Sequence, residues 1–197
     1  MNKIDQFRIN EMRKLISPNK QKVIVDIGGG LHSICKDMEF KKKIIIDGDA
    51  SFKPDILMDL NNKVKLKDNS VDIVIAGVIL EHLINPFKFL LELRRILKKG
   101  GELILSTPNI TCLKSRIKMI FGKLPTNCAK AFATKEDTLF FHKVDFNWES
   151  LKELVEKAGF KIIYKQNTGI FLKKELVLSP RYCPFKLGEK FIIKAIK

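Results

Sequence analysis

Short, continuous apolar runs recur along the chain and predict buried strands. Most of these runs are separated by segments with helical periodicity, and several end in glycine or aspartate. Continuous apolar runs that alternate with helices are typical of a parallel sheet covered on both faces. The strands predicted in this way lie at residues 22–27, 44–46, 55–59, 71–76 and 103–106.

Helical periodicity predicts helices over residues 4–16, 33–40 and 148–158. Another helix is expected to begin at Asn85-Pro86, which provides a cap residue and a proline at the first helical position. We expect it to end at Gly100-Gly101. The side chains predicted to face inward from this helix are Phe87, Leu90, Leu91 and Leu97.

The C-terminal part of the chain departs from this alternation. Residues 110–145 have little periodicity, and two strands, 160–164 and 171–178, are expected to form a hairpin around Asn167-Thr168-Gly169. We therefore predict one α/β domain over residues 1–197, with an N-terminal helix within 1–20 and an insertion at 110–146. Its core would be a doubly wound, mostly parallel seven-stranded sheet with helices on both faces and a C-terminal antiparallel hairpin.

Composition fits a globular protein, with 45% hydrophobic and 30% charged residues. No run approaches the roughly 20 apolar residues of a membrane span, and the first residues lack the pattern of a signal peptide. The cytoplasm is the expected compartment. The four cysteines are scattered without C-x-x-C spacing, so reduced thiols and no bound metal are expected.

The net charge of +15 is compatible with an anionic partner. A small anionic molecule, a nucleic acid and a membrane surface are the alternatives, and a lysine-rich but inert surface is a further one. The segment 185–196 mixes apolar residues with lysines, so it either touches a membrane surface or packs onto its own domain.

Glycine and acidic residues follow the first strands, where ligands bind in a doubly wound sheet. Gly28-Gly29-Gly30 permits a tight turn, but Ser33 stands where a dinucleotide fingerprint needs its third glycine. Asp47 or Asp49, after the second strand, could hold a ribose diol, or these residues could simply form a turn. Asp59 follows the third run and could meet an adenine amino group.

Together these residues resemble the class I, Rossmann-like S-adenosylmethionine-dependent methyltransferases. The run Asp72–His82, followed by Asn85-Pro86 and by residues 93–109, is similar to the family almost position for position. Two departures stand out, because Lys99 replaces a usual proline and His32 replaces the third glycine of the family's G-x-G-x-G.

The resemblance implies S-adenosylmethionine as the cofactor. It assigns residues to the methionine, ribose and adenine parts of that cofactor and to the wall beside it. The assigned residues are Asp26, Gly28 and Gly30 (methionine), Asp47 or Asp49 (ribose), Asp59 (adenine), and Ala76 and Gly77 (along the cofactor). His82 and His142 are the candidates for a catalytic base, and His32 is a third histidine near the predicted site.

The acceptor is expected to be set by the insertion, which is rich in basic and aromatic residues. This content suits O-methylation of a small molecule such as a sugar, a lipid-linked or a phosphorylated intermediate. An RNA methyltransferase and a catalytically inactive binding protein with the same fold are the alternatives. The basic and aromatic residues of the insertion are Lys114, Arg116, Lys118, Phe121, Lys123, Lys130, Phe132, Lys135, Phe140 and Phe141.

Overall fold

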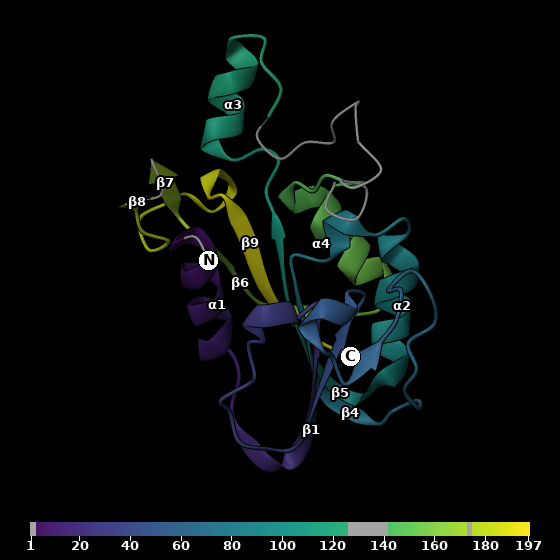
Figure 1. The fold of residues 1–197 in the computed structure, drawn as a ribbon. Helices are drawn as coiled ribbons and strands as arrows, with labels where there is room; N and C mark the ends of the chain where they lie inside the picture. The colour runs from purple at the N-terminus through teal and green to yellow at the C-terminus, as the bar shows by residue number, and fades with distance from the viewer. Residues whose placement is uncertain (1–2, 126–141, 173–174) are drawn as a thin grey trace.

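The predicted apolar runs form strands of one seven-stranded sheet (Figure 1). The computed structural model describes residues 3–125, 142–172 and 175–197. The strand order is β3-β2-β1-β4-β5-β9-β6, in which only β9 runs antiparallel to its neighbours β5 and β6. The doubly wound, mostly parallel fold is confirmed. The strands are β1 Asn19–Ile27, β2 Phe40–Asp47, β3 Ile56–Leu57, β4 Val71–Gly77, β5 Leu97–Pro108, β6 Lys161–Asn167 and β9 Lys190–Ile196.

Helices cover both faces of this sheet. Helix α1 (Lys3–Lys14) lies against one face, while α2 (Pro86–Ile96) and α4 (Trp148–Lys157) lie against the other (Figure 1). Side chains of successive residues in a strand point to opposite faces of the sheet. In β4, the cluster with α1 contains Ile73 and Ile75, whereas the cluster with α2 contains Val74. The apolar runs are continuous because each strand is buried on both faces.

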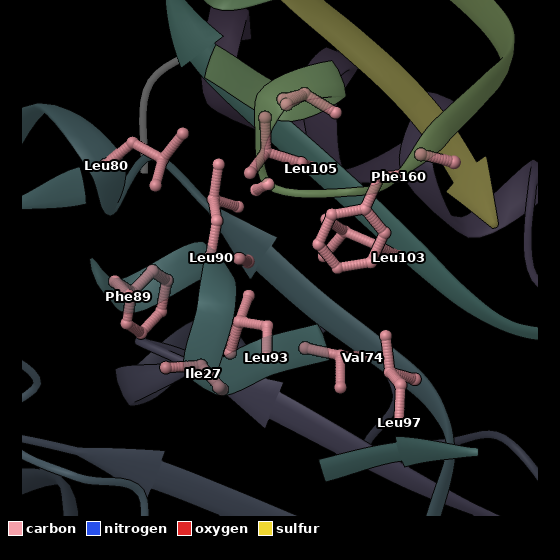
Figure 2. Close-up of a cluster of buried hydrophobic side chains, with 14 of the residues drawn as sticks. Ile27, Val74, Leu80, Phe89, Leu90, Leu93, Leu97, Leu103, Leu105 and Phe160 are labelled. Carbon is pink, nitrogen blue, oxygen red and sulfur yellow. The ribbon is translucent and has the colours of Figure 1, made fainter. Parts of the chain in front are cut away.

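The larger core lies between the sheet and α2. Figure 2 shows Leu90 and Leu93 of α2 beside Val74, Leu103 and Leu105 of the strands. All of these side chains are fully buried. Burial of each such side chain contributes roughly 1.5–3 kcal/mol, so this layer fixes the sheet that carries the strand ends.

The predicted helix over 33–40 is wrong. The chain forms the 3-10 helix η1 (Gly30–His32) and then turns before β2 begins at Phe40. A parallel crossover usually needs a dozen or more residues, and little room remains here for helical turns. The backbone N–H of Ile34 also donates to the Asp26 carboxylate at 2.6 Å, which holds the segment against the end of β1.

Helix α2 begins where predicted but differs in its buried face and its end. Asn85 caps it by accepting the Lys88 N–H at 2.9 Å. Phe87 and Leu91, predicted to face inward, are 38% and 43% exposed. The helix ends at Ile96 rather than at the glycines, because Leu97 already pairs with β4. The buried stripe of α2 is Pro86, Phe89, Leu90, Leu93 and Ile96.

The predicted hairpin around residues 167–169 also has different partners. Strand β6 pairs with β9, and β7 (Ile170–Leu172) pairs with β8 (Glu175–Leu178) in a separate two-stranded sheet. Buried Asn167 donates to the carbonyls of residues 183–185, which turns the chain away from a local hairpin. The segment 185–196 packs onto its own domain, since Phe191, Ile192 and Ile193 of β9 are buried in the sheet.

The described part of the insertion contains one further helix, α3 (Leu113–Ile120), which projects from the body (Figure 1). Lys130, Phe132, Lys135, Phe140 and Phe141 of the predicted insertion lie outside the described residues. No helix within residues 3–125, 142–172 and 175–197 is long and apolar enough to cross a membrane.

Candidate functional site

Two adjoining cavities lie at the carboxyl ends of β1, β2 and β4. The first has a volume of about 540 Å³ and the second about 570 Å³. Both are lined by Gly28, Phe52, Val78 and Ile79, so they form one elongated cleft that meets at the turn after β1. This is the edge of a doubly wound sheet at which ligands bind.

The glycine turn requires its glycines. Gly28 has a φ of +71°, and a Cβ at this position would lie 2.0 Å from Cδ1 of Ile79. Gly30 has a φ of +43°, and its N–H donates to the Asp47 carboxylate at 3.0 Å. Only a residue without a side chain fits Gly28, so the backbone is open to the cleft there.

Asp26 lies at the floor of the first cavity. It is 1% exposed, and its Oδ2 accepts hydrogen bonds from Ser33 Oγ at 2.8 Å and from Ile34 N at 2.6 Å. Burial raises the pKa of Asp26 to about 6, against the lowering effect of these bonds. The carboxylate is therefore fixed in place and is costly to keep ionised without a positive partner.

Arg8 of α1 also lines the first cavity, and the sequence interpretation missed it. It is only 7% exposed, and its Nη1 lies 3.2 Å from Ser106 Oγ. A Cβ on Gly77 would come within 2.6 Å of the same Nη1, so the guanidinium rests on the end of β4. The sequence feature that could have revealed Arg8 is its position four residues before Met12, which puts both residues on the buried stripe of α1.

The acidic residues after β2 and β3 line the second cavity. Asp47 links the two turns, since Oδ2 accepts the Gly30 N–H and Oδ1 accepts the Asp49 N–H, each at 3.0 Å. Asp49 accepts the Ser51 N–H at 2.8 Å, and bonds from Ser51 lower its pKa. Asp59 accepts two bonds from Asn61, which lower its pKa below the usual range.

The end of β4 forms the wall between the two cavities. Gly77 lines the first cavity, whereas the side chain of Ala76 is buried in the core beside α2. Val78 has a φ of +59°, a conformation that a β-branched residue rarely adopts, and it lines both cavities. Backbone strain of this kind concentrates at ligand sites.

The candidate bases His82 and His142 lie together just beyond β4. Their ring centroids are 5.1 Å apart, and the 3-10 helix η3 (Leu80–His82) also carries Glu81. Glu81 is 1% exposed, and burial raises its pKa to about 7. His82 lines the second cavity, so this polar cluster adjoins the cleft.

His32 does not close the cleft. It is exposed on the rim of the first cavity, and its N–H donates to Gly29 O at 2.9 Å within η1. The positive φ angles of described non-glycine residues occur at Lys53, Asn69 and Val78, so His32 needs no left-handed backbone. The departure from the glycine pattern is therefore compatible with a bound ligand.

This fold and cleft define a Rossmann-like domain with a ligand cleft at the carboxyl ends of its parallel strands. Residues 12–105 match the family described as "Methyltransferase domain". Over this stretch, which is just under half of its length, the chain is similar to methyltransferase domains. The description of one relative, a probable S-adenosylmethionine-dependent methyltransferase, gives S-adenosylmethionine as the cofactor. The cleft fits that cofactor, because a buried acid and a buried guanidinium line one end and carboxylates line the other.

Relatives and solved structures extend this similarity. The chain is 33% identical over 110 residues to a probable S-adenosylmethionine-dependent methyltransferase of Mycolicibacterium smegmatis, covering 55% of this chain and 35% of the relative. It is 32% identical over 111 residues to a demethylmenaquinone methyltransferase of Staphylococcus haemolyticus, covering 52% of this chain and 46% of the relative. The chain thus spans less than half the length of either relative.

The fold similarity extends over nearly the whole chain. A methyltransferase structure from Thermotoga maritima superposes with a TM-score of 0.69 at 23% identity, covering 98% of this chain and 91% of the other. One from Listeria monocytogenes gives a TM-score of 0.69 at 14% identity, with 98% and 99% covered. At these identities the superpositions show the fold alone.

Proposed function

We propose that this protein transfers a methyl group from S-adenosylmethionine to an oxygen atom of a small-molecule acceptor. The observation that carries the proposal is the elongated cleft formed by the two cavities at the ends of β1, β2 and β4. Bound there, the cofactor would supply an activated methyl group on a sulfonium. The protein's part is then to hold the acceptor in line with that methyl group and to exclude water.

The methionine end belongs in the first cavity. Asp26 is the partner for the ammonium group, since a buried carboxylate without a matching cation is unfavourable. Arg8 is the partner for the carboxylate group, because its guanidinium lines the same cavity. The two charges come from different elements, α1 and β1, and line the same cavity, so together they would orient the amino-acid part of the cofactor.

The adenosine end belongs in the second cavity. Asp47 is the better candidate for the ribose hydroxyls, because the Gly30 N–H holds its carboxylate against the glycine turn. Asp49 instead caps the turn that begins at Ala50. Asp59 and the neighbouring backbone are candidates for the adenine, since they line the far side of the same cavity.

An acceptor with an apolar part and an anionic group fits the described insertion. Helix α3 and the turn after it expose large apolar side chains between lysines, and Lys114 pairs with Glu189 at 2.5 Å. Such a surface favours a lipid-linked or phosphorylated intermediate over a neutral polar molecule. The exposed apolar residues are Ile117, Met119, Ile120, Phe121 and Leu124.

Transfer of tritiated methyl groups to separate acceptor panels tests this function. Phosphorylated sugars and lipid-linked phosphates form one panel, and RNA forms the other. We expect label in the first panel. Base treatment then identifies the acceptor oxygen, because a methyl ester releases the label and a methyl ether retains it. Label in RNA that falls steeply with salt would instead support the nucleic-acid alternative. Cofactor binding without label in any panel would favour an inactive binding protein.

A further inference from the structure

We propose that Glu81, His82 and His142 form a binding site for one first-row divalent metal ion beside the cofactor cleft. The ligand atoms of these three side chains all lie within 4.8 Å of one another. The cysteine spacing gave no hint of such a site, because the donors are the adjacent Glu81 and His82 together with His142 from a distant segment. The proposed metal site does not involve the cysteines. The role of the ion in the reaction rests on the proposed function.

The backbone holds the three donors in place. Glu81 and His82 belong to η3, which follows the strained Val78 at the end of β4. The segment with His142 is fixed onto η3 because the N–H groups of Lys143 and Val144 donate to the Glu81 carbonyl, at 2.6 and 3.2 Å. Two segments far apart in sequence are thereby joined at the site itself.

The two carboxylate oxygens of Glu81 differ in their hydrogen bonding. Oε2 accepts a hydrogen bond from buried Thr107 at 3.1 Å, which orients the group. Oε1 is buried and has no hydrogen-bond partner in the described part of the chain. It lies 4.0 Å from Nε2 of His82. A buried, unsatisfied carboxylate oxygen is costly unless a cation meets it.

The donor set defines the class of metal. Two imidazole nitrogens and one carboxylate favour ions such as Zn²⁺, Co²⁺ or Fe²⁺ over Mg²⁺ and Ca²⁺, which prefer oxygen ligands. Tetrahedral ligands at about 2.0–2.2 Å from Zn²⁺ stand roughly 3.4 Å apart, so binding draws the donors together slightly. Three protein ligands leave at least one position open.

The open position suggests what the ion does. His82 lines the second cavity of the cleft, so a ligand on the ion would face the cofactor site. An acceptor hydroxyl or phosphate oxygen bound to the ion would be positioned there, and a bound hydroxyl would lose its proton more readily. In this arrangement the two histidines act as ligands, and neither is available as the catalytic base.

Titration with Co²⁺ tests the site directly, because its visible spectrum distinguishes nitrogen and oxygen ligands from thiolates. The full chain, first stripped with a chelator, is titrated as wild type, His82→Ala, His142→Ala and Glu81→Gln. His32→Ala is the matched control, since His32 lies on the rim of the first cavity, away from the cluster. Binding of S-adenosylhomocysteine is measured in every sample and reports both folding and the cofactor site.

We expect one Co²⁺ per chain without thiolate bands, weakened at least about tenfold by each substitution in the cluster and unchanged by His32→Ala. Absence of stoichiometric binding by the wild type would overturn the proposal. So would binding that is undiminished in both His82→Ala and His142→Ala, or a thiolate spectrum. Failure of the wild type to bind S-adenosylhomocysteine would count against the proposed function alone, since the metal readout does not depend on it.

Discussion

Replacing Asp26 by Asn removes a buried charge while keeping an oxygen for Ser33 and Ile34. The carboxylate is 1% exposed, and burial raises its pKa from 3.8 to about 6. If Asp26 is retained for the cofactor rather than for the fold, its loss should make the free protein more stable and the complex weaker.

The magnitude follows from the pKa. Between about pH 4 and pH 6 the folded protein binds this proton more tightly than the unfolded chain, so the contribution of Asp26 to stability falls as the pH rises. At about 1.4 kcal/mol per pH unit, the loss in the free energy of unfolding reaches about 3 kcal/mol. It levels off above the pKa of Asp26 in the folded protein. Asp26→Asn should therefore match the wild type near pH 4 and exceed it by up to about 3 kcal/mol at pH 8.

Urea denaturation at several pH values measures the free energy of unfolding of both proteins. Subtracting one value from the other at each pH cancels the contribution of the other carboxylates. Asp37→Asn is the control, because Asp37 is exposed. The same Asp26 variant should bind S-adenosylhomocysteine about 10- to 100-fold more weakly, the value of a lost charge-assisted hydrogen bond. A stability difference that does not change with pH, or unchanged cofactor affinity, would refute the reasoning.

The remaining predictions concern the core, the glycine turn and α1. Leu93→Ala should lower the free energy of unfolding by about 3–5 kcal/mol in urea, whereas half-exposed Leu91→Ala should cost less than about 1 kcal/mol; equal losses would contradict the observed face of α2. Gly28→Ala should lower the melting temperature more than Gly100→Ala, since both glycines have positive φ but only Gly28 has a neighbour in the way. Arg8→Gln should weaken S-adenosylhomocysteine binding about tenfold in calorimetry but leave methylthioadenosine, which lacks the carboxylate, within about twofold.

The strands and the cofactor end of the cleft could be predicted from sequence because their signals are local. A continuous apolar run followed by glycine or aspartate identifies a buried parallel strand and the residue at its carboxyl end. Gly28, Asp47 and Asp59 were found in this way, and all three line the cleft. The start of α2 was equally local, since Asn85 caps its own helix.

The features that sequence reasoning missed depend on contacts between distant residues. Strand β6 pairs with the distant β9, and Asn167 at its end bonds through its amide to carbonyls beyond residue 182. Arg8 reaches the cleft because α1 packs against β5 and β9, which brings its guanidinium to Ser106 of β5. His142 meets Glu81 through backbone bonds of its two following residues, and no spacing along the chain indicates that meeting.

Calorimetric titration with S-adenosylhomocysteine tests the central claim, that the cleft along β1, β2 and β4 holds the cofactor with Asp47 on the ribose. The wild type, Asp47→Ala and Asp49→Ala are compared at one pH, with circular dichroism to verify folding. We expect one site of micromolar affinity, weakened at least about tenfold by Asp47→Ala and less by Asp49→Ala. Absence of binding by the folded wild type, or equal affinity in all three proteins, would contradict the account.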